Sequence, residues 1–296
     1  MERGEFCSKL LLFGEYGVML GSKALCLPLP LFSGSFAMPP SKPNAEQEQS
    51  NSWLGAFASF LEASSIGTKY NVPEFAADVR AGMYFASSIP TGYGIGSSGA
   101  VCAAFYSYYR KVMPDSIESL RVELAELESF FHGKSSGLDP LVSLTGRPIV
   151  ISDGKLKPIE HFSNKDVGVF LIDTQTPRTS KDLISNTISF LNDPVNSPTK
   201  QSLIELTNRC IDTYMKGSSC LFSEAVNELS AFQLGYLNQL IPPSLIPIWG
   251  EGFIDSRFTL KLCGAGGGGF VLGFTTQMSE TSKFLARKGI TILPIS

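Results

Sequence analysis

The stretch PTGYGIGSSGA, at residues 90–100, lies between two apolar segments and decides how the surrounding chain is read. Residues 83–89 suit a strand, and residues 101–109 suit a buried helix. Three alternating glycines let the backbone turn tightly and approach a ligand closely. Two serines then begin the helix, whose first turn offers unpaired N–H groups and a partial positive charge. The stretch therefore predicts a phosphate-binding turn, with an ordinary glycine-rich turn as the alternative.

The composition is that of a globular chain with a small negative charge. Its 296 residues are enough for one large domain or two smaller ones. Hydrophobic residues make up 43% and charged residues 17%, proportions that predict a buried core rather than disorder. The formal charge of −3 gives no reason to expect nucleic acid or an anionic membrane as a partner, so any anion site must be local.

Cysteine usage and the first residues predict a cytoplasmic protein. None of the six cysteines forms a CxxC pair, which excludes the usual metal-ligand spacing and suits a reducing compartment. The N-terminal sequence has no apolar core after a basic start, so no signal peptide is predicted. No uncharged apolar run reaches about 18 residues, so we expect no membrane span.

The first half of the chain is expected to mix strands and helices around the glycine-rich stretch. Residues 39–52 are polar and predict a surface loop, whereas residues 53–61 carry large apolar side chains at helical spacing. Strands are expected at residues 8–13, 18–20, 24–28, 71–75, 77–80, 83–89, 148–152 and 156–159. The last two flank Asp153-Gly154, a favoured hairpin turn.

Two carboxylates near the middle of the chain are candidates for chemistry. Ser116 suits the N-cap of a helix that ends near Phe131. On this helix Glu128 lies about 70° from the centre of the apolar stripe, so it either reaches inward or remains a solvated edge charge. Gly133 is expected to stop the helix. Asp139 precedes a proline, which predicts an extended rather than a helical conformation.

The second half reads as a strand, two long helices, two strands, a helix and a strand. The strands are expected at residues 167–174, 258–263, 270–274 and 290–295, and the helices at residues 197–216, 221–240 and 279–287. Ser197 is expected to cap the first of these helices. This order predicts a split β-α-β, ferredoxin-like layer. A glycine run at residues 264–269 connects its second and third strands.

Several well-known nucleotide-binding and catalytic patterns are absent. No GxxxxGK[ST] motif occurs, which excludes a Walker A loop, and the alternating glycines do not have the GxGxxG spacing of a dinucleotide fold. No HRD or DFG motif of protein kinases is present, and no GxSxG elbow accompanies His132 or His161. The early strand lysine, the two glycine-rich segments and the acidic residue after a helix end still need one explanation.

Three motifs, in this order, resemble those of the GHMP kinases, which are named after galactokinase, homoserine kinase, mevalonate kinase and phosphomevalonate kinase. The first is a lysine followed by Gly-Glu, at residues 9–16 (KLLLFGEY). The second, Pro-x3-Gly-Leu-Gly-Ser-Ser-Ala, is similar to residues 90–100, with Gly99 in place of the usual alanine. The third, Lys-x-Ser/Thr followed by Gly-Ala and four glycines, is similar to residues 261–269 (KLCGAGGGG).

Within this superfamily the closest resemblance is to the mevalonate kinases. Their Glu-x3-His-Gly-x2-Ser-Gly-x-Asp pattern is matched by residues 128–139 (ESFFHGKSSGLD), and their Pro-Arg-x-Thr stretch resembles residues 177–180 (PRTS). Tyr16 departs from the histidine usual after Gly-Glu and is more similar to phosphomevalonate kinases. The chain, at 296 residues, is also short for a eukaryotic-type mevalonate kinase.

The resemblance implies an α+β, two-domain GHMP kinase fold. Residues 1–163 would form an N-terminal ATP-binding domain that is ribosomal protein S5 domain 2-like, and residues 164–296 a ferredoxin-like C-terminal domain. It also implies ATP and Mg²⁺ as cofactors and a small-molecule alcohol as substrate. Neither nucleic acid nor a membrane is expected as a partner, and the chain would be a monomer or a homodimer.

The resemblance also assigns roles to single residues. Asp139 would take the proton of the acceptor hydroxyl, and Lys9 would stabilise its carboxylate and neutralise phosphate charge. Ser98, with Ser97 as the alternative, and Glu128 would hold Mg²⁺. The nucleotide phosphates would contact Pro90, Gly92, Tyr93, Gly94, Ile95, Gly96, Ser97, Ser98 and Gly99. The substrate would contact Glu15, Tyr16, Arg178, Ser180, Gly266 and Gly267.

The implied reaction is transfer of phosphoryl from ATP to the primary hydroxyl of mevalonate. The alternatives are a phosphomevalonate kinase, another GHMP kinase such as a sugar kinase, and a non-catalytic sensor of nucleotide or sugar. A phosphorylated acceptor should demand extra basic residues, for which only Lys134 and Lys181 are candidates. The presence of Lys9 and Asp139 disfavours a sensor, and Lys9 disfavours a diphosphomevalonate decarboxylase.

Overall fold

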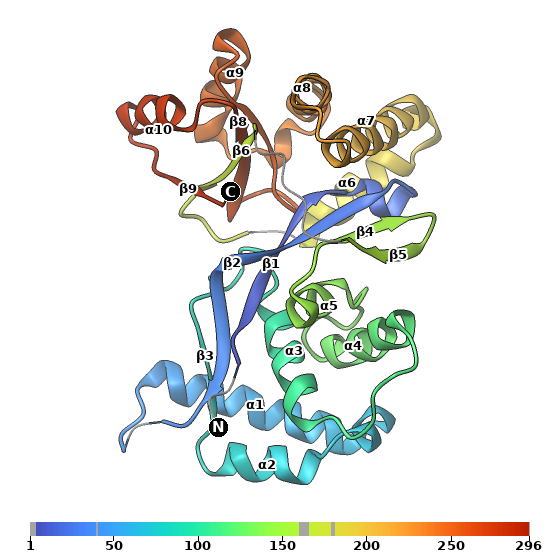
Figure 1. Ribbon diagram of the computed structural model, residues 1–296, viewed down its shortest axis with the longest axis vertical. Coiled ribbons are helices and arrows are strands. Elements are labelled where there is room, and N and C mark those ends of the chain that lie inside the picture. The colour runs from blue at the N-terminus through green and yellow to red at the C-terminus, as the bar shows by residue number, and fades with distance from the viewer. Residues whose placement is uncertain (1–3, 40, 160–165, 179–180, 296) are drawn as a thin grey trace. The chain divides into compact units, whose positions relative to one another are not determined.

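The computed structural model describes residues 4–39, 41–159, 166–178 and 181–295 (Figure 1). The chain forms two compact units, each assembled from separate stretches of sequence. The first contains Met1–Leu10, Pro28–Pro90 and Ile95–Arg147, and the second contains Leu11–Leu27, Thr91–Gly94 and Pro148–Ser296. The domain boundary expected between residues 163 and 164 falls outside the described residues and stays a prediction.

The described part of the first unit is mainly helical around an aromatic core. Its elements are α1 (Ala45–Ala63), α2 (Val72–Arg80), β3 (Tyr84–Ser87), α3 (Ser97–Tyr109), α4 (Ile117–His132) and α5 (Leu138–Thr145). Helix α3 packs against both α4 and α5, and most of its length is buried because it is apolar on every side (Figure 1). Phe57, Phe75 and Phe105 are buried and meet one another edge to face.

Strands β1 (Phe6–Phe13) and β2 (Ala24–Ala37) contribute residues to both units, since the division falls within each strand. In the first unit, residues 34–37 of β2 pair antiparallel with β3. In the second unit, residues 24–26 of β2 pair with β4 (Ile149–Ser152), which forms a hairpin with β5 (Lys155–Pro158). The hairpin turn has positive φ angles at Asp153 and Gly154, 52° and 71°, as the sequence predicted.

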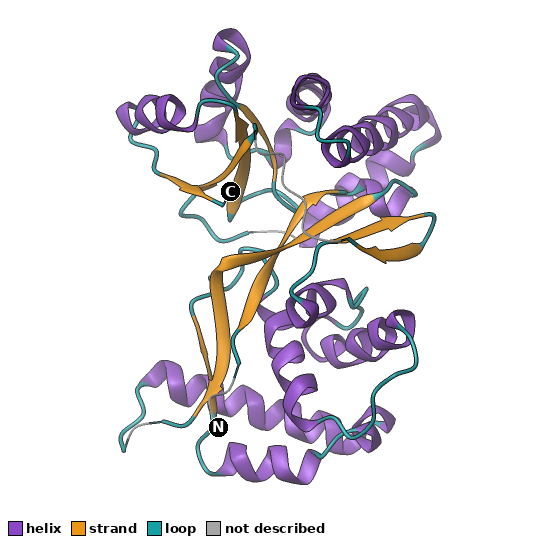
Figure 2. Ribbon diagram, in the orientation of Figure 1, coloured by secondary structure: helices purple, strands orange, loops and turns teal. Residues whose placement is uncertain are grey.

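A four-stranded antiparallel sheet belongs to the second unit (Figure 2). Its spatial order is β7 (Thr259–Leu262), β8 (Phe270–Thr275), β6 (Gly168–Asp173) and β9 (Ile292–Pro294). Counted along the chain, this order is second, third, first and fourth, as in a split β-α-β unit, so the ferredoxin-like layer is confirmed. The helices described in this unit are α6 (Lys181–Asn192), α7 (Ser197–Met215), α8 (Ser219–Tyr236), α9 (Ile246–Asp255) and α10 (Met278–Arg287).

Short 3-10 helices complete the secondary structure. They are η1 (Gly17–Leu20), η2 (Ser65–Lys69), η3 (Pro194–Asn196), η4 (Asn238–Leu240) and η5 (Pro243–Leu245). Helices α7 and α8 pack on each other, and α8 also packs against β7. Among the helices in the described ranges, none combines the length and the apolar content that crossing a bilayer would require.

The strands expected at residues 71–75 and 77–80 were wrong, because this segment is helix α2. Its buried residues are Val72, Phe75, Ala76 and Val79, which is helical rather than alternating spacing. Pro73 lies in the first turn, where its missing N–H breaks no helical hydrogen bond.

Two polar or short segments near the N-terminus also differ from the sequence predictions. Residues 39–52 are not only a loop: α1 begins at Ala45, with Asn44 and Gln47 forming a capping box. The first turns of α1 are mostly exposed, so they carried no apolar signal. Residues 18–20 belong to η1 instead of a strand, and Gly21 ends that turn with a φ of 101°.

Asp139 is helical rather than extended, so that prediction was wrong. It is the second residue of α5, and Pro140 follows within the first turn, where a proline is tolerated. Its carboxylate therefore lies at the start of a helix. Helices α6 and α9 were not predicted, and Asn196 rather than Ser197 is the N-cap of α7.

Candidate active site

An ion pair between β1 and α5 is the centre of a polar cluster in the first unit. Lys9 Nζ lies 2.9 Å from Asp139 Oδ1, and the two side chains are 10% and 28% exposed. The backbone fixes Lys9, because its N–H donates to the carbonyl of Ile95 at 2.8 Å. An ammonium and a carboxylate thus lie side by side, a pair that can neutralise an anion and accept a proton.

The turn that leads into α3 closes over Lys9. Gly96 is the N-cap residue of α3, with a φ of 84°, and a Cβ on it would lie 2.8 Å from Cγ of Lys9. Because the N-cap is a glycine, no N-cap side chain occupies the first-turn N–H groups of the helix. Ser97 and Ser98 form that first turn. The positive end of a helix therefore begins directly beside the lysine, which suits an anion.

Gly99 brings α3 close to α5. A Cβ at this position would lie 2.8 Å from the backbone carbonyl carbon of Asp139 and 2.9 Å from the nitrogen of Pro140. Both are backbone atoms, which do not move aside as a flexible side chain would. Glycine at this position, in place of the alanine usual in the second motif, therefore allows α5, which carries Asp139, to lie close to α3.

Glu128, on α4, points inward to the same cluster. Ser98 Oγ donates to its Oε1 at 3.0 Å, and Ser135 Oγ donates to its Oε2. The side chain is almost fully buried, so of the two readings of the sequence the inward one is confirmed and the solvated edge charge is wrong. Burial, and then the negative charge of Asp139, raise the pKa of Glu128 to about 7, while both serines and Lys9 oppose the shift.

The donor set around Glu128 fits a magnesium ion. Glu128 and Asp139 repel each other across the cluster, and a divalent cation would relieve that repulsion. Carboxylate and hydroxyl oxygens are the hard donors that Mg²⁺ prefers, and protein sites for it often supply only one or two carboxylates beside substrate phosphates. Within the described residues no group of three or more His, Cys, Asp or Glu forms a denser metal site.

Replacement of Glu128 by glutamine is expected to change how stability depends on pH. The folded-state pKa of about 7 lies above the unfolded value of 4.5, so the folded protein binds more protons in this range and Glu128 destabilises it progressively as pH rises from 4.5 through 7. Without added metal, Glu128→Gln should therefore be more stable relative to wild type at pH 8 than at pH 5, by roughly 2 kcal/mol. Urea unfolding in EDTA at both pH values measures this difference.

Glu126→Gln is the matched control, because Glu126 lies exposed on the same helix. Its stability should follow that of wild type at both pH values. If Glu128→Gln also tracks wild type, the carboxyl group does not titrate abnormally and the argument for a cation at this position loses its support.

Arg178 is the centre of a second polar cluster, in the second unit. Its guanidinium occupies the space that side chains at Gly94 and Gly264 would need, and a Cβ at Gly269 would lie 3.3 Å from its Nε. Nη2 donates to the carbonyl oxygen of Cys263. Nε has no hydrogen-bond partner among the described residues. The arginine therefore holds two glycine-rich segments together and retains a donor that suits an anion.

Tyr93 and Gly92 complete the part of the turn that belongs to the second unit. The backbone N–H of Arg178 donates to the carbonyl of Gly92 at 3.3 Å. Tyr93 Oη donates to Asp173 Oδ1 at 3.0 Å, and its ring packs edge to face on Phe270. In the first unit, Pro90 is half-buried and Ile95 is buried. Contact of these residues with a nucleotide stays a prediction.

Glu15 and Tyr16, expected to contact substrate, make buried contacts in the second unit. Glu15 Oε1 lies 2.6 Å from Lys261 Nζ, with both side chains almost completely buried. Tyr16 has a φ of 57°, and its Oη donates to the carbonyl of Ala265 at 2.7 Å. Burial raises the pKa of Tyr16 to about 12, so its hydroxyl remains a donor. Both residues therefore anchor the start of the glycine run at Gly264.

Gly266 and Gly267 pack against the chain itself. A Cβ on Gly266 would lie 2.7 Å from the carbonyl oxygen of Leu240, and Gly267 N–H donates to that same oxygen at 2.7 Å. Their expected contact with substrate stays a prediction. Ser180, also expected to contact substrate, lies outside the described residues.

Sequence reasoning missed the role of Ser135, which contacts Glu128 in the first cluster, and that of Lys261, which pairs with Glu15. Ser135 lies in a polar loop, where nothing distinguishes a functional serine from a solvated one. Lys261 did carry a signal, because it lies within the apolar strand β7 and is fully buried. A lysine in such a place requires a carboxylate partner.

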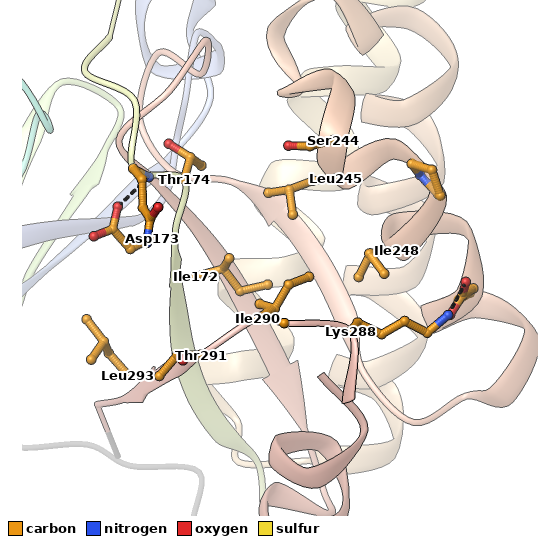
Figure 3. Close-up of a pocket in the computed structure, with 14 residues that line it drawn as sticks. Ile172, Asp173, Thr174, Ser244, Leu245, Ile248, Lys288, Ile290, Thr291 and Leu293 are labelled. Atoms are coloured by element: carbon orange, nitrogen blue, oxygen red, sulfur yellow. Dashed lines mark hydrogen bonds and ion pairs between the residues drawn. The ribbon is translucent and has the colours of Figure 1, made fainter. Parts of the chain in front are cut away.

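A cavity of about 590 Å³ in the second unit borders the end of β6 (Figure 3). Its charged groups are Asp173, Glu251 and Lys288, and each is already engaged within the chain. Asp173 Oδ1 accepts from the N–H of Gln175 at 2.7 Å, and Lys288 Nζ lies 2.8 Å from Glu251 Oε2. None of the candidate residues named above lines this cavity, so it adds no group to the two clusters.

Comparison with known proteins shows what this chain is similar to. Residues 56–147 match the sequence profile of the GHMP kinases N terminal domain. The chain resembles the L. major mevalonate kinase solved in complex with R-mevalonate, with a TM-score of 0.70, 15% identity and coverage of 100% of this chain and 96% of that one. This likeness confirms the two-domain GHMP kinase fold. Part of the chain is therefore similar in sequence to the GHMP kinases, and the whole chain shares their fold.

Two curated relatives are similar in sequence. The mevalonate kinase of Pyrococcus horikoshii is 28% identical over 174 residues, which are 51% of this chain and 51% of that protein. The mevalonate kinase of Arabidopsis thaliana is 27% identical over 212 residues, which are 63% of this chain and 54% of that protein. The chain thus matches about half the length of these curated relatives.

Proposed function

We propose that this chain is an ATP-dependent kinase that phosphorylates the hydroxyl group of a small alcohol. The observation that carries the proposal is the 2.9 Å ion pair of Lys9 and Asp139 beside the glycine N-cap of α3. Phosphoryl transfer depends on positioning and charge neutralisation more than on covalent help. A helix start, a cation and a proton-accepting carboxylate meet these needs, and all three belong to the first unit.

Each residue of this cluster has a role in the proposal. The first-turn N–H groups of α3 bind phosphate oxygens, and Lys9 neutralises their charge. Asp139 accepts a hydrogen bond from the acceptor hydroxyl and takes its proton at a carboxylate oxygen. Glu128 and Ser98 would hold Mg²⁺, which neutralises the charge of the transferred phosphoryl group when bound with ATP.

For the acceptor we propose mevalonate. Both curated relatives are named mevalonate kinase, and residues 128–139 carry the pattern expected of that group. A phosphorylated acceptor should demand extra basic residues at the site. Lys134, one of the two candidates for this role, is exposed.

Turnover assays with a panel of acceptors test the proposal. The purified chain is supplied with ATP and Mg²⁺ and with mevalonate, phosphomevalonate or galactose, and the phosphorylated product is identified by mass spectrometry. Mevalonate is expected to have a kcat/KM at least about a hundredfold above that of either alternative, because a site built for one polar group rejects its analogues strongly.

The other outcomes are equally informative. Preference for phosphomevalonate would keep the kinase and replace the acceptor, in line with Tyr16 after Gly-Glu. Nucleotide binding without turnover of any acceptor would favour the non-catalytic sensor. If neither ATP binding nor turnover is measurable, the roles of Lys9 and Asp139 are wrong.

A further inference from the structure

A cavity of about 430 Å³ lies at the C-terminal end of α3, within the first unit. Its walls come from the end of α3 and the residues after it, from Leu120 on α4, and from Leu144 and Thr145 at the end of α5. These are the helices whose other residues include Ser98, Glu128 and Asp139. The cavity is at the opposite end of α3 from the proposed phosphate-binding turn.

The guanidinium of Arg110, in the wall of this cavity, is buried without being fully satisfied. Its side chain is 5% exposed, and Nη1 donates to Tyr106 Oη and lies 3.1 Å from Met113 Sδ. Nε has no hydrogen-bond partner among the described residues, since Glu123 Oε2 is 3.7 Å away. Glu123 Oε2 is unpaired as well, so this long ion pair leaves hydrogen-bonding capacity on the guanidinium.

The charge of the cavity wall is positive. Among the described residues that line it, Arg110 and Lys111 are cations, and there is no Asp or Glu. Behind the wall, Glu123 is shared between Arg110 and Lys69, whose Nζ lies 3.2 Å from Glu123 Oε1. A cation that follows a helix C-terminus is common, and this alone explains the exposed Lys111. Arg110 is buried for another reason, because its guanidinium lies 4.5 Å from the ring centroid of Tyr106 and faces Glu123.

The rest of the wall is apolar. Val112 and Met113 are 74% and 77% exposed, an unusual exposure for two neighbouring large apolar residues. Leu120 and Leu144 continue the apolar surface into the cavity. A volume of this size, with apolar walls and a few polar groups at one place, is typical of a site for a small molecule.

We propose that this cavity binds a small amphipathic anion, either a phosphate monoester or a carboxylate with a short alkyl body. Its anionic head pairs with Arg110 and Lys111, and its alkyl part lies along Val112, Met113 and Leu144. The site is separate from the proposed phosphoryl-transfer cluster but is built on the same three helices. A ligand bound here is thus placed to bias the positions of Ser98, Glu128 and Asp139.

Ligand-observed NMR titrations of the full chain with n-hexyl phosphate and n-hexanoate test the site. Methyl phosphate and n-hexylammonium are the matched probes that lack the alkyl body or the negative charge. Saturable binding of n-hexyl phosphate, at least about tenfold tighter than that of methyl phosphate, is expected because several methylene groups are buried. Comparable binding of n-hexanoate would identify a carboxylate as an equally suitable head. Equal binding of n-hexylammonium would overturn the proposal.

Two substitutions locate the binding. Lys111→Glu should weaken n-hexyl phosphate about tenfold, because it reverses an exposed charge at the cavity rim. Lys42→Glu makes the same change at another exposed lysine of the first unit and should leave the affinity within about twofold. Lys9→Ala, at the phosphate-binding turn, should also leave it unchanged. An affinity that falls with Lys9→Ala but not with Lys111→Glu would place the probe at the turn and refute the cavity site.

Discussion

Asp139→Asn is expected to lower kcat with mevalonate by about 10²- to 10⁴-fold, the range typical of a lost general base. Asparagine keeps the shape of the side chain but cannot take the hydroxyl proton, and it removes the charge that pairs with Lys9 at 2.9 Å. Nucleotide contacts at the start of α3 do not involve this carboxylate in the proposal. The affinity for ATP should therefore stay within about twofold of wild type, which binding measurements and steady-state kinetics determine together.

Asp153→Asn is the matched control for this prediction. Asp153 lies in the hairpin turn between β4 and β5 with a φ of 52°, a conformation that asparagine also adopts readily. Its kcat should equal that of wild type. An Asp139→Asn enzyme that retains a tenth or more of the wild-type kcat would show that another group accepts the proton, or that none is needed.

Lys261→Met is expected to lower the free energy of unfolding of the second unit by about 3–5 kcal/mol. The substitution removes the partner of Glu15, which lies 2.6 Å away with its side chain 3% exposed. The carboxylate is then buried without a compensating charge, which costs far more than the lost contact itself. Trp249 is buried in this unit, so its fluorescence during urea unfolding, in a Trp53→Phe background, reports the change.

Two comparisons separate the buried charge from general effects of losing a lysine. Lys288→Met breaks an exposed ion pair with Glu251 in the same unit and should cost no more than about 1 kcal/mol. The double change Glu15→Leu with Lys261→Met removes both charges and should recover most of the stability lost in the single variant. A double variant as unstable as Lys261→Met would mean that shape, and not charge, makes the pair important.

The sequence predicted most where local pattern and tertiary environment agree. The glycine-rich turn and the buried helix predicted after it correspond to the Gly96 N-cap and α3. This prediction was correct because a helix that is apolar on every side has to be buried. The Asp153-Gly154 turn was read correctly because few residues accept two consecutive positive φ angles. Lys9 and Asp139, which resemblance rather than spacing brought together, are in contact.

The predictions that failed depended on information that a local window does not contain. The start of α1 is exposed and polar, so it had no apolar period, and the nine residues of α2 were too few for their helical spacing to be distinguished from two short strands. Asp139 was expected to be extended because proline disfavours helix before it, but a helix start accepts that proline. Glu15 and Lys261 are 246 positions apart, and no periodicity connects residues so distant.

Gly99 limits what protein engineering can safely change in this chain. Design by consensus would restore the alanine that is usual at this position of the second motif. Here that single methyl group would collide with backbone atoms of Asp139 and Pro140 at less than 3 Å, so α5 would have to shift. A substitution intended to stabilise a helix would thus displace the proposed general base. Alanine, although more common at this position of the motif, would therefore be less suitable here than glycine.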